Sequence, residues 1–313
     1  MSDNLLKIVF FGTSSFAVPA LRYLVQNGYN LVAVVTQPDR PTGRQRVTMP
    51  SPVKKVTVEL NIPVLEFHNL KEEDSFKKFK HLNPDICIVA AYGKIIPSQY
   101  LEVPKHGFLN IHPSLLPKYR GPSPIQNALL NGDKETGVAI LKVDEEVDHG
   151  PVLKATSYKL EATSYYKEVE QELAELGGKL LLETLPKYIN GEIKPKEQNH
   201  AEATFTKKME QHDGKIDWNK TAEKIYNQIR ALNPEPGTWT SWNNQIINIK
   251  SAVLSDRSAK ETPGTVVKLD NSIAVASKTC YLVLKQTQLE GGKAMDPKAF
   301  INGHPELIGS KLE

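Results

Sequence analysis

The residues of this chain whose types and spacing could do chemistry are an asparagine and a histidine two positions apart, Asn110 and His112. They lie in the stretch Phe108-Leu-Asn-Ile-His-Pro113, whose first five residues are expected to form a short buried strand. Because alternate side chains of a strand share a face, Asn110 and His112 set an amide donor beside an imidazole. The proline that follows ends the strand where this polar pair emerges.

A second loop offers a carboxylate partner for the histidine. The segment Val143-Asp-Glu-Glu-Val-Asp-His-Gly150 follows an expected strand over 137–143 and contains Asp148. A buried carboxylate near His112 would hold the ring and favour its protonated form. Two histidines and a carboxylate also permit a zinc site, but the spacing here matches no helix-based or clustered ligand pattern. In the alternative interpretation, Asn110 and His112 only satisfy buried backbone groups.

Apolar residues follow the polar pair at a point where the chain is expected to turn. Leu115 and Leu116 come after Ser114 and are closed by Pro117. In a loop, such residues could form one wall of a pocket for a flat ligand.

Asn110-x-His112 leading into Ser114-Leu-Leu-Pro117, followed by Asp144-x-x-x-Asp148-x-Gly150, resembles the folate-dependent formyltransferases. The resemblance implies 10-formyltetrahydrofolate as the co-substrate and no metal. It also implies two sets of site residues. The catalytic set is Asn110, His112 and Asp148, and the set that contacts tetrahydrofolate is Ser114, Leu115, Leu116 and Pro117.

The chemistry implied by the resemblance is attack of an amine on the formyl carbon, followed by expulsion of the folate nitrogen from a tetrahedral intermediate. Asn110 would donate to the developing oxyanion, a contribution of roughly 10²–10³ in rate. His112 would move protons and help to stabilise the oxyanion, worth about 10²–10⁴. Asp148 would orient His112. The sequence has no Ser-His or Cys-His nucleophile signature, so no covalent enzyme intermediate is expected.

The elements that must position these residues read as a doubly wound, mainly parallel α/β domain. Continuous apolar runs at 5–12, 31–36 and 85–91 are typical of parallel strands covered on both faces, with helical patterns between them. The turn after the first run has one glycine and not a G-x-G-x-x-G pattern, so a dinucleotide site has weak support. A long helix is expected over 161–189.

The chain changes character after this helix. Residues 190–207 are polar and without periodicity, which predicts an interdomain linker after a catalytic domain over 1–189. Short β-rich runs then predict a smaller, OB-like β-barrel domain over 208–313. From Met209 onward 13 Lys and Arg oppose 12 Asp and Glu, so the difference, 13 − 12, is only +1. This domain therefore has no clear basic surplus for binding nucleic acid.

An arginine-rich segment between Gln37 and Pro52 holds one acid and three arginines, Arg40, Arg44 and Arg46. Its proline and glycine residues predict an irregular loop, and guanidinium groups suit phosphate contacts, although a solvated charged loop has the same composition. Together with Met49-Pro-Ser-Pro-Val-Lys54, the segment resembles the methionyl-tRNA formyltransferase branch of the family. In that branch this loop enters the end of the tRNA acceptor stem.

The resemblance to this branch extends over nearly the whole chain, including 229–239 and 290–303. It implies formyl transfer to the free amino group of methionyl initiator tRNA, in support of translation initiation, with the three arginines binding tRNA. Alternatives are formyltransferases acting on a sugar nucleotide or glycinamide ribonucleotide, and a formyltetrahydrofolate hydrolase. From another class, a non-catalytic RNA-binding protein could share the scaffold. The basic loop and the barrel argue against the other enzymes, and the intact catalytic set argues against the RNA-binding protein.

Length and composition agree with this picture. At 313 residues with 40% apolar content, the chain can bury a sizeable core and favours two domains, and a net charge of +3 alone diagnoses no nucleic-acid partner. Cys87 and Cys280 lie in separate apolar runs and suggest neither a disulfide framework nor a CxxC metal site. The first apolar run is interrupted by Lys7 and is too short for a signal peptide or a membrane span. A cytoplasmic monomer is expected.

Overall fold

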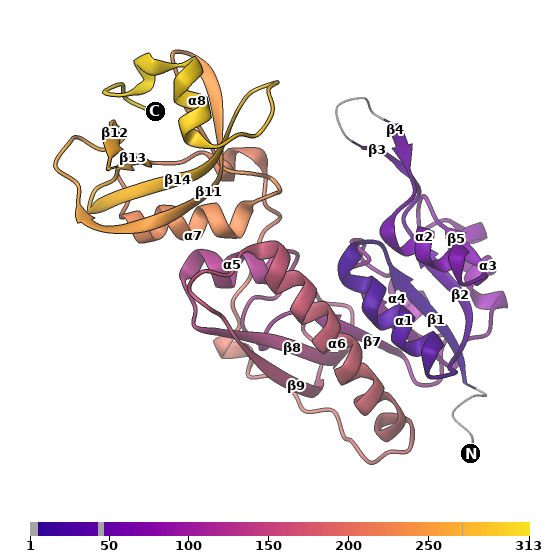
Figure 1. The fold of residues 1–313 in the computed structure, drawn as a ribbon. Coiled ribbons are helices and arrows are strands. Elements are labelled where there is room, and N and C mark those ends of the chain that lie inside the picture. Colours follow the sequence, from indigo (N-terminus) through magenta and orange to yellow (C-terminus); the bar gives the residue numbers. More distant parts are fainter. Residues whose placement is uncertain (1–5, 43–46, 271) are drawn as a thin grey trace. The chain divides into compact units, whose positions relative to one another are not determined.

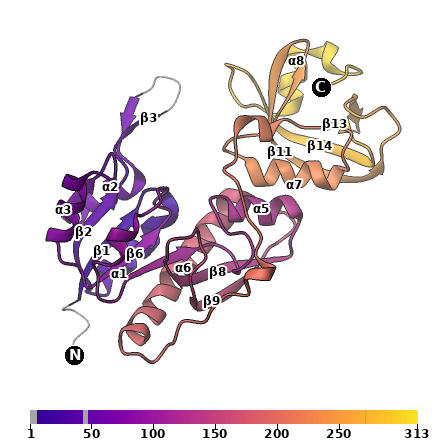
Figure 2. The same cartoon turned by 180° about the vertical axis from the view of Figure 1, so that it is seen from behind.

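The structure, a computed structural model, describes residues 6–42, 47–270 and 272–313 (Figures 1 and 2). The chain divides into two compact units. The first comprises Met1–Pro124, Glu135–Lys159 and Glu170–Thr206, and the second comprises Ile125–Lys134, Leu160–Val169 and Lys207–Glu313. The predicted boundaries at 189 and 208 stay a prediction. Of the expected linker over 190–207, residues 190–206 belong to the first unit and Lys207 belongs to the second.

The first unit is built on a seven-stranded sheet with the order β5-β2-β1-β6-β7-β8-β9. The first five strands in this order pair in parallel, and β8 and β9 add on as antiparallel strands. Their bounds are β1 (Lys7–Gly12), β2 (Asn30–Thr36), β5 (Val64–Glu66), β6 (Ile86–Ala90), β7 (Phe108–His112), β8 (Glu135–Lys142) and β9 (Val152–Lys159). The predicted mainly parallel α/β domain is therefore confirmed.

Helices cover both faces of this sheet. On one face, Phe79 of α3 and Tyr100 of α4 pack with Phe11 and Phe108 of the strands in an aromatic core. On the other face, α6 approaches the strands closely, because a Cβ placed on Gly177 would lie 2.7 Å from Ile111 of β7. The helices of this unit are α1 (Val18–Gln26), α2 (Pro52–Glu59), α3 (Glu73–His81), α4 (Ser98–Leu101) and most of α6 (Tyr166–Ile189), whereas α5 (Pro124–Asn131) belongs almost entirely to the second unit.

The arginine-rich segment differs from the irregular loop expected from the sequence. It holds two short antiparallel strands, β3 (Arg40–Thr42) and β4 (Val47–Met49), which pair with each other and not with the main sheet. Threonine and valine favour extended backbone, and two such runs can pair wherever the chain reverses. Arg40 lies on β3, whereas Arg44 and Arg46 lie outside the described residues.

The second unit contains a five-stranded antiparallel sheet with the order β10-β11-β14-β13-β12. Its core includes Trp218, Trp242 and Phe300, packed against strand residues such as Ile249 and Leu282. The predicted separate β-rich domain is confirmed. Its elements are α7 (Ala222–Leu232), β10 (Trp239–Trp242), β11 (Gln245–Ser258), β12 (Val266–Leu269), β13 (Ser272–Ala276), β14 (Cys280–Leu289) and α8 (Pro297–Gly303).

Among the described residues, none of the helices has both the length and the apolar character needed to cross a bilayer.

Candidate active site

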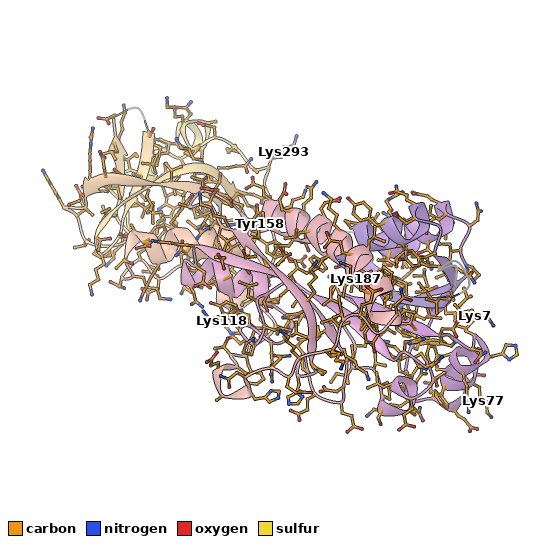
Figure 3. The ribbon with its side chains drawn as sticks, turned by 90° about the horizontal axis from the view of Figure 1, so that it is seen from below. Lys7, Lys77, Lys118, Tyr158, Lys187 and Lys293 are labelled. Atoms are coloured by element: carbon orange, nitrogen blue, oxygen red, sulfur yellow. The ribbon has the colours of Figure 1, made fainter. Side chains whose placement is uncertain are left out.

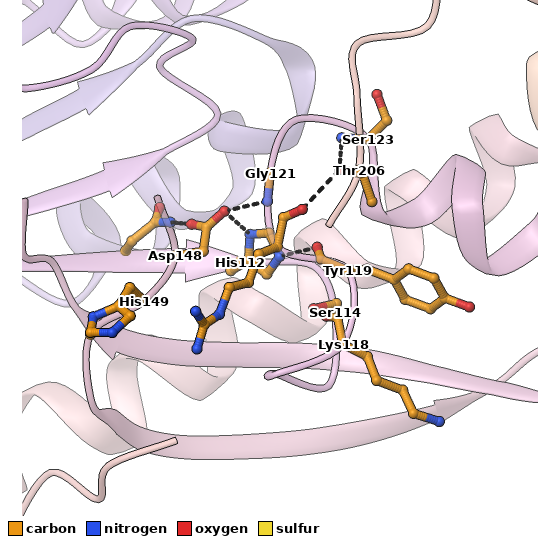
Figure 4. A network of polar contacts seen from close by, with 12 residues as sticks. His112, Ser114, Lys118, Tyr119, Gly121, Ser123, Asp148, His149 and Thr206 are labelled. Carbon is orange, nitrogen blue, oxygen red and sulfur yellow. Dashed lines mark hydrogen bonds and ion pairs between the residues drawn. The ribbon is translucent and has the colours of Figure 1, made fainter. Parts of the chain in front are cut away.

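The candidate site lies at the carboxyl end of β7, where the parallel strands of an open α/β sheet usually meet their ligands. The strand ends at His112, directly before Pro113. His112 is 4% exposed, and Asn110 is half-buried on the same side of the strand. The two side chains face one carboxylate, as their alternation along the strand predicts (Figure 4).

That carboxylate belongs to Asp148, in the loop between β8 and β9. Its Oδ1 accepts a hydrogen bond from Asn110 Nδ2 at 3.0 Å, and its Oδ2 lies 3.5 Å from His112 Nδ1. Oδ2 also accepts from the backbone N–H of Gly121 at 2.8 Å. Asp148 has φ +50°, in the left-handed region, so the loop must hold its backbone in an uncommon conformation. The structure thus brings together the three residues predicted to be catalytic.

The second nitrogen of His112 faces a backbone carbonyl. Nε2 lies 2.9 Å from the carbonyl oxygen of Tyr119, which can only accept, so Nε2 carries a hydrogen. A further proton on the ring would enter at Nδ1, on the side of Asp148. The loop that supplies this carbonyl is fixed in turn, since the Tyr119 N–H donates to Thr204 Oγ1 at 2.8 Å.

The residues predicted to contact folate form the turn that follows β7. Ser114 is buried, and its hydroxyl donates to the Lys118 carbonyl at 2.6 Å, which closes the turn. Leu115 packs against β8, where a Cβ added to Gly137 would lie 2.6 Å from its Cδ2. Leu116 and Pro117 are half-buried. The turn therefore presents partly exposed apolar side chains directly after the strand that carries Asn110 and His112.

His149 is directed away from His112 (Figure 4). Its Nδ1 lies 2.7 Å from Asp144 Oδ2, and its ring stacks on that of His200 with 4.1 Å between centroids. Within residues 6–42, 47–270 and 272–313, no group of three His, Cys, Asp or Glu side chains is arranged to hold a metal ion. Glu146 is exposed, and its N–H donates to Asp144 Oδ1 at 3.1 Å.

Tyr92, beyond the end of β6, belongs to the core. Its ring is 2% exposed and packs edge-on against Phe11 at 5.3 Å between centroids. Burial raises the pKa of the Tyr92 hydroxyl well above its usual range, so this group is no acid or base at neutral pH. Its carbonyl ties neighbouring strand ends together by accepting from Thr13 Oγ1 and Gln37 Nε2.

Sequence reasoning missed three contributors to the site. Two of them, the Tyr119 carbonyl and the Gly121 N–H, are backbone groups and have no side-chain signature. The third, Gln198, lies in the segment expected to be a linker, where polar composition concealed a buried side chain. Its role depends on contacts with the Asp148 loop, which only the folded structure shows.

The two units match known family models in order. Residues 6–185 match formyl transferase, and residues 208–305 match the formyl transferase C-terminal domain. The methionyl-tRNA formyltransferase of Marinobacter nauticus is 41% identical over 304 residues, which are 97% of this chain and 98% of that protein. The methionyl-tRNA formyltransferase of Halalkalibacterium halodurans is 40% identical over 309 residues, covering 98% and 96%.

Solved structures share the fold at lower identity. HypX from Aquifex aeolicus in complex with tetrahydrofolic acid gives a TM-score of 0.69 at 17% identity, over 97% of this chain and 48% of that chain. This chain therefore spans about half the length of HypX. An N-formyltransferase from Helicobacter canadensis in complex with folinic acid and dTDP-3-aminofucose gives a TM-score of 0.69 at 19% identity, over 90% and 98%.

Proposed function

The chain belongs to the formyltransferase family, on its methionyl-tRNA formyltransferase branch, and from this premise we propose the roles of its residues. The reaction is transfer of a formyl group from 10-formyltetrahydrofolate to the free amino group of methionyl initiator tRNA. We assign the chemistry to Asn110, His112 and Asp148. The observation that carries this assignment is the Asp148 carboxylate, which contacts the Asn110 amide with one oxygen and faces the His112 ring with the other.

Asn110 is the proposed donor to the oxyanion. Its Nδ2 has two hydrogens, of which one is bonded to Asp148. The other makes no hydrogen bond within the part of the chain that the structure describes. A donor held in this way needs no reorganisation when the negative charge develops on the formyl oxygen, and such a donor is worth roughly 10²–10³ in rate.

His112 is the proposed proton carrier. Its Nε2 is committed to the Tyr119 carbonyl, so the attacking amine would lose its proton to Nδ1. The resulting imidazolium would lie 3.5 Å from Asp148 Oδ2. General acid–base catalysis of this kind contributes typically about 10²–10⁴. The proton then passes to the leaving folate nitrogen.

Asp148 orients the other two residues and attacks nothing. Both of its oxygens are engaged, one with Asn110 and the other with the Gly121 N–H and the His112 ring. A carboxylate engaged in this way is a poor nucleophile but a good anchor for an imidazolium. Amine attack on the formyl carbon therefore proceeds without a covalent enzyme intermediate.

The proposed folate contacts are the turn residues Ser114, Leu115, Leu116 and Pro117. The partly exposed apolar side chains of this turn suit one face of a flat ring system, and the Ser114 hydroxyl is already bonded within the turn. HypX, which shares this fold, has been solved in complex with tetrahydrofolic acid.

The proposed tRNA contacts are Arg40, on β3, together with Arg44 and Arg46, which come between β3 and β4 in the sequence and lie outside the described residues. Guanidinium groups bind phosphate oxygens with paired donors, so these arginines suit the acceptor stem. We assign tRNA binding also to a C-terminal domain over 208–313, joined by residues 190–207 to a catalytic domain over 1–189. Since the acceptor is a substrate of translation, the proposed place of action is the cytoplasm. The monomeric state stays a prediction.

The test compares three acceptors with 10-formyltetrahydrofolate as the donor: methionyl initiator tRNA, free methionine and an amino-sugar nucleotide. We expect fast transfer only to the charged tRNA and a loss of about 10²–10⁴ in kcat for His112→Ala. Transfer to the sugar, or hydrolysis alone, would keep the chemistry and overturn the acceptor. Full activity of His112→Ala would overturn the assigned centre.

A further inference from the structure

The segment 198–206 is packed onto both loops that surround the catalytic residues. Gln198 is buried, at 8% exposure, and its side chain lies between Arg120 and the loop of residues 148–150. Further along the segment, Thr204 Oγ1 accepts from the Tyr119 N–H, and Thr206 Oγ1 accepts from the Ser123 N–H at 3.1 Å (Figure 4). The polar composition of the segment therefore reflects internal hydrogen bonding and not exposure to solvent alone.

The contacts of Gln198 fix the orientation of its amide. Arg120 donates to Gln198 Oε1 from Nε at 3.2 Å and from Nη2 at 2.9 Å, and a guanidinium can only donate. Nε2 must therefore be the end that faces the catalytic loop. There it donates to the carbonyl oxygens of Asp148 at 2.9 Å, His149 at 3.0 Å and Gly150 at 2.7 Å.

Three consecutive carbonyls that converge on one amide define the path of the chain through Asp148. This path is uncommon, because Asp148 has φ +50°. Non-glycine residues hold such a conformation only where their surroundings impose it. Gln198 supplies such a constraint through these three carbonyl groups.

Arg120 connects Gln198 to the second loop of the site, residues 119–121. The residue before it gives the carbonyl that holds His112, and the residue after it gives the N–H that holds Asp148. Arg120 is 3% exposed. Its guanidinium contacts Gln198 Oε1 and His200 Nδ1, the latter at 2.8 Å, and lies over the ring of Phe205. One buried amide thus joins the two loops that fix the histidine and the carboxylate.

We propose that Gln198 is a positioning residue for formyl transfer, which sets the Asp148 carboxylate through the carbonyls of residues 148–150. The proposal rests on the catalytic role assigned to Asp148 in the proposed function. Gln198 touches no reacting atom in this account. It acts by holding the carboxylate that orients His112.

Two substitutions of Gln198 test the acceptor and the donor of its side-chain amide. Gln198→Glu keeps the acceptor for Arg120 and replaces the donor with a carboxylate oxygen that faces three carbonyls. Gln198→Met keeps the volume and removes both. Because misplacement of a catalytic group by about 1 Å can cost 10²-fold in rate, we expect each variant to lower kcat by about 10- to 100-fold. KM for the folate donor and for the charged tRNA should stay within about twofold.

A control variant removes a partly buried contact to a carbonyl just before the other end of β7. Tyr188 of α6 donates its hydroxyl to the His106 carbonyl at 3.0 Å, just before the strand begins. Tyr188→Phe should leave kcat unchanged while lowering the melting temperature. A fall of kcat in this variant equal to that in Gln198→Met would mean that any loosening of the first unit slows the reaction, and it would overturn the proposal.

The decisive measurement is a double-mutant cycle that combines Gln198→Met with Asp148→Asn. The rate of formyl transfer is measured in a single turnover with excess enzyme. If Gln198 acts through the carboxylate, Gln198→Met should change the rate less than about twofold once Asp148 is asparagine. Equal losses in the two backgrounds, or a wild-type rate for both Gln198 variants, would overturn the proposal. Should Gln198→Met fail to fold, Gln198→Glu gives the same cycle. A wild-type rate for Asp148→Asn alone would instead overturn the proposed function.

Discussion

At the scale of a single residue, Asn110 is the side chain whose contribution is easiest to isolate. One of its amide hydrogens is bonded to Asp148 at 3.0 Å, and the other is the proposed donor to the oxyanion. We expect Asn110→Ala to lower kcat by about 10²–10³, because a single oxyanion donor contributes that much. Steady-state kinetics with methionyl initiator tRNA check this, with thermal unfolding of the same sample to exclude a loss of fold. An unchanged kcat would show that another group meets the oxyanion.

The sequence predicted the side chains of the site but not its backbone groups. Alternation along a short strand was enough to place Asn110 and His112 on one side, and both contact the predicted Asp148. The carbonyl that fixes the tautomer of His112 comes from Tyr119, and every residue type carries such a group. The path of the loop decides which carbonyl group lies next to His112. This path depends on contacts with distant residues, such as Thr204, which comes 85 positions after Tyr119.

At the scale of the element, the loop from β8 to β9 closes against the end of β8 at Gly150. A Cβ at this position would lie 2.0 Å from the Lys142 carbonyl oxygen, which is backbone and cannot rotate away. Gly150→Ala must therefore displace the loop that carries Asp148. We expect a loss of about 1–3 kcal/mol in the free energy of unfolding, together with a lower kcat.

The control for this substitution is Gly303→Ala at the end of α8, where an added Cβ meets no atom within 4 Å. Its effect on the free energy of unfolding should stay within about 0.5 kcal/mol. Thermal and denaturant unfolding of both variants, with kcat, make the comparison. Equal stability of Gly150→Ala and the wild type would mean that this loop does not pack against β8 as described.

The periodicity of apolar residues predicted the long helix and the buried strands. It did not predict the short pair of strands β3 and β4 or the packing of the irregular segment after α6. The helix expected over 161–189 is α6, Tyr166–Ile189, and the apolar runs became buried strands. The hairpin of β3 and β4 has only three residues in each strand, too few for alternation to be visible. Residues 190–206 have little regular structure at all, so their packing could not be inferred from any period.

At the scale of the whole molecule, the question is whether tRNA is attracted by net charge or held by particular cations. The net charge of +3 is small for a protein that binds a polyanion. Some lysines are paired locally, as Lys77 is with Glu73 at 2.6 Å on the surface of the first unit (Figure 3). We therefore expect Arg40, Arg44 and Arg46 to supply most of the phosphate contacts.

Each phosphate contact made by a cation adds about one unit to the slope of log affinity against log salt concentration. Replacing Arg40, Arg44 and Arg46 together by alanine should therefore raise KM for methionyl initiator tRNA, reduce the salt slope by about 2–3 and spare KM for the folate donor. The matched control replaces Arg22, Lys77 and Lys78, three cations of the first unit that pair with acids at its surface. Both triple variants lose the same formal charge, so an equal effect on the salt slope would attribute tRNA binding to net charge and remove Arg40, Arg44 and Arg46 from the site.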